Sequence, residues 1–358
     1  MPGISSERPF ATEADVRACR AALKHGSKSF YMASLLLPRR VREPAGVIYA
    51  FCRQADDTVD VERSPLAAVD TLRERLLSAA RERPQNTPLD RALADVLARH
   101  AIPVAIPEAL LEGLAWDVEG RRYADRSGAY AYATRVAGTV GAMMALLMGA
   151  RSAELVSRAV TLGIAMQFTN IARDVGEDAR AGRIYLPLQW LVEEGVDPEA
   201  FLRSPVYTSS IARVVRRLTN EADRLYDEGR TGIDGLPADC RPGIHAARLL
   251  YGEIGRRIHR DGVDPVRHRS VVPRGRKFAL LSRAVCDSVL AAAPVPVSNI
   301  PEASFLVDAV LATPAPETPD RTPKLAALDE RAGWVVDLYS RLEARDRNGR
   351  PLRAEQGA

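Results

Sequence analysis

Apolar residues recur at spacings of three and four along most of the chain, and this periodicity predicts helices. The clearest runs cover residues 45–59, 110–118 and 155–173. Residues 211–230 set a stripe of apolar positions among basic and acidic ones, which suits an amphipathic helix with a solvated outer face. No run has the two-residue alternation of a half-buried strand. The pattern therefore predicts an all-α fold.

Proline and glycine clusters separate these runs and indicate where the helices end. The breaks fall at Pro38 and at residues 84–88, 103–107, 182–187, 195–198 and 235–242.

The composition changes after about Ala291. Residues 292–323 contain seven prolines, which is typical of a linker, although a short helix is predicted at 303–311. A further helix is expected at 325–343, followed by a polar, disordered tail. We therefore predict one main helical domain over residues 11–291 and a Pro-rich linker and tail over 292–358.

Charge and composition exclude several classes of protein. The net charge of +4 is too small to indicate a nucleic-acid partner, so no nucleic acid is expected. Only four of the 50 basic residues are lysines. We interpret most of this excess of arginine as codon bias. Arginine is also the better bidentate partner for phosphate, so a few of these residues are candidate ligands. The sequence contains no Walker phosphate loop, no G-x-G-x-x-G and no H-E-x-x-H motif.

The cysteines and the longest apolar run bear on location. None of the four cysteines has C-x-x-C or zinc-ligand spacing, and no signal peptide is visible at the start, so a reducing cytoplasm is expected. The longest apolar run, residues 136–148, is too short to cross a bilayer. We expect a soluble protein, or at most one that is peripheral on the inner membrane.

Two clusters of carboxylates lie in runs with helical character. Asp56 and Asp60 are four residues apart, as are Asp174 and Asp178. Residues at this spacing share one face of a helix, where like charges repel, so the repeated arrangement indicates a partner outside the chain. Mg²⁺ is usually held by one or two carboxylates and completed by substrate phosphates. The alternative for the first cluster is a helix end with a surface ion pair to Arg53.

Polar residues accompany the second cluster. Gln167 and Asn170 interrupt an otherwise apolar run and would need partners when buried. A metal-bound water or a diphosphate oxygen would supply them; a polar network between helices is the alternative. Arg183 and Tyr185 follow, and Arg183 either completes a phosphate site or lies on the surface.

Three further features have weaker implications. Ser27 either caps a helix whose amides attract an anion or is a plain N-cap. The glycines at 138 and 141 indicate close helix packing, which is a safer interpretation than room for a long apolar ligand. The five histidines show neither metal-ligand nor catalytic spacing.

Together, these segments resemble the squalene/phytoene synthase family over residues 21–277. The resemblance rests on L-G-x-x-x-Q-x-x-N-I-x-R-D-V-x-E-D at 162–178 and R-I-Y-L-P at 183–187. Residues 121–149 also look like that family. Within the family, the sequence of residues 174–183 is most similar to bacterial phytoene synthases of carotenoid biosynthesis.

The resemblance implies an isoprenoid-synthase-type helical bundle with a central active-site cavity. The implied reaction is the head-to-head condensation of two molecules of geranylgeranyl diphosphate, through a cyclopropyl (prephytoene) diphosphate, to phytoene with release of diphosphate. Mg²⁺ or Mn²⁺ is the implied cofactor, and no nicotinamide cofactor is expected. Because phytoene is very apolar, peripheral membrane contact and downstream carotenoid enzymes are expected partners.

The resemblance also implies roles for individual residues. The implied catalytic residues are Asp56, Asp60, Asp174, Asp178, Tyr49, Tyr132 and Tyr185. The implied substrate-binding residues are Ser27, Lys28, Phe30, Arg53, Gln167, Asn170, Arg173, Arg183, Tyr251 and Arg269. The implied metal ligands are Asp56, Asp57, Asp60, Asn170, Asp174 and Asp178.

Two alternatives stay open at this point. A squalene-type synthase of the same family would use C15 substrates, with NADPH for a reductive product. A non-catalytic relative would serve as an assembly or lipid-binding protein, but it would have no need for both sets of acids. A calcium-binding helical protein is excluded because no D-x-[DN]-x-[DN]-G loop is present.

Overall fold

The structure is a computed structural model that describes residues 9–316, apart from 62–63, 261, 291–292 and 294. The side chains of residues 28, 29, 59–61 and 260 also lie outside the description. The chain divides into Met1–Pro319 and Asp320–Ala358. The second unit, including the helix expected at 325–343, lies outside the described residues, and the two predicted domain boundaries remain predictions.

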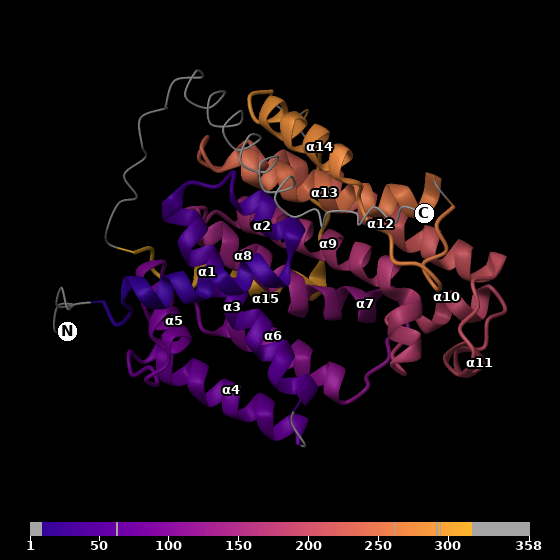
Figure 1. Ribbon diagram of the computed structural model, residues 1–358, viewed down its shortest axis with the longest axis horizontal. Helices are drawn as coiled ribbons and strands as arrows, with labels where there is room; N and C mark the ends of the chain where they lie inside the picture. Colours follow the sequence, from indigo (N-terminus) through magenta and orange to yellow (C-terminus); the bar gives the residue numbers. More distant parts are fainter. Residues whose placement is uncertain (1–8, 62–63, 261, 291–292, 294, 317–358) are drawn as a thin grey trace, which may run out of the picture. The chain divides into compact units, whose positions relative to one another are not determined.

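Within the described residues every regular element is a helix, which confirms the predicted fold class (Figure 1). The elements are α1 (Glu13–Gly26), α2 (Lys28–Ser34), α3 (Arg39–Val61), α4 (Pro65–Ala80), α5 (Pro88–Arg99), α6 (Ala105–Val118), α7 (Arg126–Ala133), the π-helical turn η1 (Thr134–Gly138), α8 (Thr139–Leu147), α9 (Ala153–Arg180), α10 (Leu188–Glu193), α11 (Pro198–Arg203), α12 (Ser209–Ile233), α13 (Arg241–Arg260), α14 (Arg274–Asp287), the 3₁₀ turn η2 (Pro301–Ala303) and α15 (Ser304–Leu311).

Local sequence explains where the helices begin. The side chains of Ser152 and Thr208 accept hydrogen bonds from the first turns of α9 and α12, in the usual manner of N-caps. The predicted break at Pro38 directly precedes α3, but α3 starts at Arg39 and continues through Pro44, earlier than the predicted start at 45. Proline in the second turn removes a single backbone hydrogen bond, so α3 tolerates it.

The long helix α9 lies in the interior of the described unit. It packs against α12, α8, α13 and η1, and Figure 1 shows it between α4 and α14, which lie at opposite edges. Glycines allow α8 and η1 to approach it closely. A Cβ at Gly141 would lie 2.8 Å from the carbonyl carbon of Ala159, and one at Gly163 would lie equally close to that of Ala137. The predicted packing role of the glycine at 141 is therefore confirmed.

The outer face of α12 is less solvated than its pattern predicts. Glu228 is only 5% exposed. It accepts hydrogen bonds from the backbone N–H and the hydroxyl of Ser298, at 3.2 and 2.8 Å. The segment that follows α14 therefore covers part of the helix, and tertiary packing overrides the pattern there.

The short helix expected at 303–311 is present as α15 and packs against α9, α6 and α8. Its side chains Leu306 and Val310 are fully buried. Residues 304–311 therefore contribute to the hydrophobic core of the described unit.

No helix among the described residues is long and apolar enough to cross a membrane.

Candidate active site

The first acid cluster lies on the last turns of α3. Arg53 forms a bidentate ion pair with Asp57, with Nη2–Oδ1 and Nε–Oδ2 distances of 2.6 and 3.0 Å, and both side chains are about half exposed. Asp56 is exposed as well, while the side chain of Asp60 lies outside the described residues. The ion pair between Arg53 and Asp57 is the contact that the alternative interpretation predicts.

Tyr49 lies two turns before this cluster. Its ring packs against Gly26, where a Cβ would lie 3.0 Å from the Tyr49 Cζ atom. Burial raises the pKa of Tyr49, and Arg53 opposes that effect. Tyr49 therefore connects the acids of α3 with the end of α1.

The second cluster centres on Asp174, which two arginines hold. Arg173 donates from Nε and Nη2 to its two oxygens at 2.8 and 2.5 Å, and Arg269 lies 2.9 Å from Oδ1. Arg269 comes from the segment between α13 and α14. The guanidinium groups of Arg173 and Arg269 thus lie close together on one carboxylate. Two adjacent guanidinium groups are suited to binding a diphosphate.

One turn farther along α9, Asp178 lies in a different electrostatic environment. Burial, followed by repulsion from Asp174 and Glu177, raises the pKa of Asp178 to about 7. Arg183 acts in the opposite direction on the same carboxyl group. A positive charge close to Asp178 would therefore stabilise its ionised carboxylate.

Gln167 and Asn170 lie on the same helix, and the Asn170 amide donates to Gln167 Oε1 at 3.3 Å. Asn170 Oδ1 is buried and receives no hydrogen bond from the described residues. A buried amide oxygen without a donor is costly, and it is also a good ligand for a hard cation.

Asn170 and Asp178 therefore fit a divalent cation whose remaining ligands are water and phosphate oxygens. Mg²⁺ needs only one or two protein carboxylates when a phosphate completes its shell. Among the described residues no three His, Cys, Asp or Glu side chains lie close enough to hold an ion without such a ligand.

Three stacked tyrosines lie around Asp117, whose charge acts on Asp178. The Tyr132 and Tyr185 rings are 4.9 Å apart between centroids, and Tyr123 stacks on Tyr132 at 5.0 Å. The hydroxyls of Tyr132 and Tyr185 donate to the two oxygens of Asp117 at 3.0 and 2.9 Å. Burial and then the Asp117 charge raise the pKa of both tyrosines well above the usual range, so they remain neutral phenols.

Asp117 was not predicted from the sequence. It lies one residue before the end of α6, a largely apolar helix that also carries Glu108 and Glu112. Its negative charge also contributes to the raised pKa of Asp178, so it belongs to the same electrostatic environment. The one available signal was an acid near the end of a largely apolar helix, which does not distinguish it from Glu112 or Glu119 and does not specify its partners.

The remaining predicted residues surround Tyr251 on α13. Tyr251 is 6% exposed, and its ring lies 5.0 Å from that of Phe30. Burial raises the pKa of Tyr251 to about 12, with opposing contributions from Arg173 and Ser27. Ser27 also caps α2, because its hydroxyl accepts from the Phe30 amide at 3.3 Å. The side chain of Lys28 lies outside the described residues.

Tyr251 connects the two acid clusters. It lies within electrostatic range of Tyr49 on α3 and of Arg173 and Asp174 on α9. Tyr49 in turn lies within range of Asp56. Residues from four separate parts of the sequence therefore surround one site, although the catalytic and binding roles given to them stay predictions.

Comparisons with known proteins place the chain in a family. A family model described as squalene/phytoene synthase matches residues 23–277. A phytoene synthase of Rhodobacter capsulatus is 50% identical over 305 residues, which cover 83% of this chain and 90% of the relative. A phytoene synthase of Cereibacter sphaeroides is 45% identical over 349 residues, with 93% and 95% covered.

A crystal structure of a dehydrosqualene synthase in complex with ligand matches this fold with a TM-score of 0.70 and 32% identity. The match covers 76% of this chain and 95% of the dehydrosqualene synthase. Both the sequence and the fold lead to one assignment: the chain belongs to the squalene/phytoene synthase family.

Proposed function

We propose that this chain is a phytoene synthase, a prenyl transferase that joins two molecules of geranylgeranyl diphosphate head to head and releases diphosphate. The observation that carries the proposal is its 45–50% identity to relatives named phytoene synthase over most of their length. Two features of the geometry support it: the grouping of Arg173 and Arg269 around Asp174, and the tyrosine stack around Asp117.

The arginines would bind the leaving diphosphate. Arg173, Arg269 and Arg53 now pair with carboxylates, and each can exchange its carboxylate for a phosphate oxygen while keeping its charge. Charge that develops on the departing diphosphate is then neutralised by guanidinium groups already in place.

Asp178 and Asn170 would hold Mg²⁺ or Mn²⁺, with Asp174 and the acids of α3 completing the set proposed from the sequence. When bound, the ion supplies Lewis-acid stabilisation of the diphosphate leaving group. Its charge would also favour ionisation of Asp178, whose pKa is raised by its environment.

The tyrosines would face the carbocation that remains. Their ring faces can stabilise a cationic carbon by cation–π attraction, and the surrounding apolar residues exclude water. Because Tyr132 and Tyr185 donate to Asp117 and have strongly raised pKa values, we assign the final proton to the released diphosphate rather than to a tyrosinate.

Incubation with geranylgeranyl diphosphate and Mg²⁺, followed by mass spectrometry of the extracted hydrocarbon, tests the proposal. Phytoene is the expected product. Asp56→Asn and Asp174→Asn should each abolish turnover and leave the helical circular dichroism unchanged, while the exposed control Asp70→Asn on α4 should remain active. Full activity of both site variants would refute the metal assignment.

A C15 condensation is the second candidate, favoured by the structural match to a dehydrosqualene synthase. Parallel reactions with farnesyl and geranylgeranyl diphosphate, each with and without NADPH, separate the two. Turnover of the C15 substrate alone would replace our assignment, and no turnover of either would favour a non-catalytic relative.

A further inference from the structure

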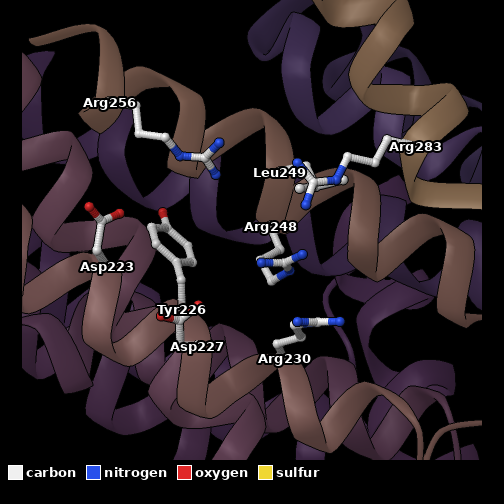
Figure 2. A pocket seen from close by; sticks show the side chains of 8 residues that line it. All are labelled: Asp223, Tyr226, Asp227, Arg230, Arg248, Leu249, Arg256 and Arg283. Carbon is white, nitrogen blue, oxygen red and sulfur yellow. The ribbon is translucent and has the colours of Figure 1, made fainter. Parts of the chain in front are cut away.

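A second charged pocket lies outside the candidate active site, between α12, α13 and α14 (Figure 2). Its volume is about 320 Å³. It is lined by Asp223, Tyr226, Asp227, Arg230, Arg248, Leu249, Arg256 and Arg283. None of these residues belongs to the set predicted for prenyl transfer.

The lining carries four arginines and two aspartates, a formal net charge of +2. Figure 2 shows Asp223 at one side of the pocket, beside the Tyr226 ring. In that view the guanidinium groups of Arg256 and Arg283 point inward from opposite sides, with Arg248 between them. The pocket thus has an acidic end and a larger basic end.

Nearby carboxylates only loosely neutralise the basic end. Asp287 lies 3.4 Å from Arg248 and 3.6 Å from Arg283, so one carboxylate serves two arginines at long range. Glu253 lies 3.4 Å from Arg256 but binds Arg276 on its other side at 2.8 and 3.1 Å. A tight bidentate pair has distances of about 2.7–2.9 Å, so these contacts leave hydrogen-bonding capacity unused.

Buried donors without acceptors give a second, independent indication. The Nε atoms of Arg230 and Arg248 are buried and have no hydrogen-bond partner among the described residues. The Arg248 side chain is 8% exposed. Burial and the nearby Arg230 charge lower the pKa of Arg248 to about 10, so it is still charged at neutral pH. A buried guanidinium N–H without an acceptor is unfavourable, and a bound anion would supply the missing acceptor.

We propose that this pocket binds a phosphate or diphosphate group and does so without a metal ion. Several guanidinium forks that converge from three helices suit the many oxygens of a phosphate better than the two of a carboxylate. The chemistry is shared by free phosphates and by the headgroups of anionic phospholipids. The inference goes beyond the proposed function and does not depend on it.

One lining residue of the pocket, Tyr226, contacts α9, the helix that carries the second acid cluster. The hydroxyl of Tyr226 lies 2.9 Å from Thr169 Oγ1 on α9, and Thr169 directly precedes Asn170. An anion at the basic end would be bound by residues different from those that would hold the substrate.

Isothermal titration calorimetry of the full chain with sodium diphosphate in EDTA tests the proposal, because chelation removes metal-dependent binding. One binding event is expected. Arg283→Gln and Arg256→Gln, which are partly exposed and should fold, should each weaken it about tenfold or more. Arg216→Gln, an exposed arginine on α12 outside the pocket, is the matched control and should leave it unchanged.

Two comparisons make the result decisive. Arg269→Gln alters the candidate active site and should leave this binding event in place. Co-sedimentation with phosphatidylglycerol vesicles, compared with vesicles of phosphatidylcholine alone, distinguishes a lipid headgroup from free diphosphate. Loss of either kind of binding in the Arg283 and Arg256 variants supports the proposal. Binding of neither probe, or binding that these variants do not change, would overturn it.

Discussion

Gly176 is the residue of α9 on which the segment carrying Arg269 packs, so Gly176→Ala tests how Arg269 is positioned. A Cβ at this position would lie 2.6 Å from the carbonyl carbon of Val266, and closer still to its oxygen and Cα. These are backbone atoms, which cannot move aside by changing a rotamer. The Gly176 amide also donates to the Pro265 carbonyl at 3.3 Å, so the two segments are joined at the crossing.

The substitution should have two separable effects. Relieving the overlap requires the segment to shift, and overpacking of this kind costs about 1–3 kcal/mol of stability. Arg269 follows Val266 by three residues and lies 2.9 Å from Asp174, so a shift of about 1 Å would break that contact. Losing a charged hydrogen bond to diphosphate costs about 1.5–3 kcal/mol, which lowers kcat/KM by roughly tenfold to a hundredfold.

Steady-state kinetics and thermal unfolding measure the two effects. The matched control is Gly255→Ala on α13, where a Cβ would meet only Thr219 Cγ2 at 3.9 Å. Alanine there should stabilise the helix by about 0.5–1 kcal/mol and leave kinetics unchanged. Wild-type stability and kinetics in Gly176→Ala would refute the close crossing. Lower stability with unchanged kcat/KM would show that the crossing does not position Arg269 for catalysis.

Three further predictions concern other parts of the molecule. Asp117→Asn should lower kcat with little change in KM, because the hydroxyls of Tyr132 and Tyr185 lose their charged acceptor; equal kcat in steady-state assays would contradict this. Chelation of divalent cations should abolish turnover, and Mg²⁺ or Mn²⁺ should restore it, with helical circular dichroism constant throughout. Burial lowers the pKa of His245 to about 4, so the unfolded chain binds the extra proton between pH 6.5 and 4, and stability should fall by about 1–2 kcal/mol from pH 7 to 5. Denaturant unfolding of His245→Gln should show a smaller loss than the exposed control His268→Gln.

Local pattern was sufficient to predict the all-helical character of the chain and several individual helices. The run at 211–230 became α12, and its apolar stripe is buried, with Leu218 and Leu225 at 1% and 0% exposure. The run at 155–173 became the middle of α9. Helical periodicity and proline breaks are properties of adjacent residues, so a single sequence contains the information needed to recognise them.

Contacts between residues that are distant in the sequence could not be predicted from local pattern. Arg269 meets Asp174 across 95 positions, and nothing in the sequence around Arg269 marks it as a partner. Asp117 meets Tyr185 across 68 positions. Both contacts depend on which segments pack together. The family resemblance assigned Arg269 to the site as a substrate-binding residue but did not predict its contact with Asp174. Asp117 lay outside the motifs that carried the resemblance and was missed.

The packing of α9 explains how residues from so many segments can form one site. Its backbone is held against α8 and η1 at Gly141 and Gly163, closely enough that a Cβ would collide with carbonyl groups. Asn170 and Asp178 therefore project from a helix with little freedom to move. Unsatisfied and like-charged groups persist in a folded protein only where rigid surroundings hold them in place. That rigidity holds the orphaned oxygen of Asn170 and the carboxyl group of Asp178, whose pKa is raised, in place, so a cation would need to reorganise little of α9 in order to bind.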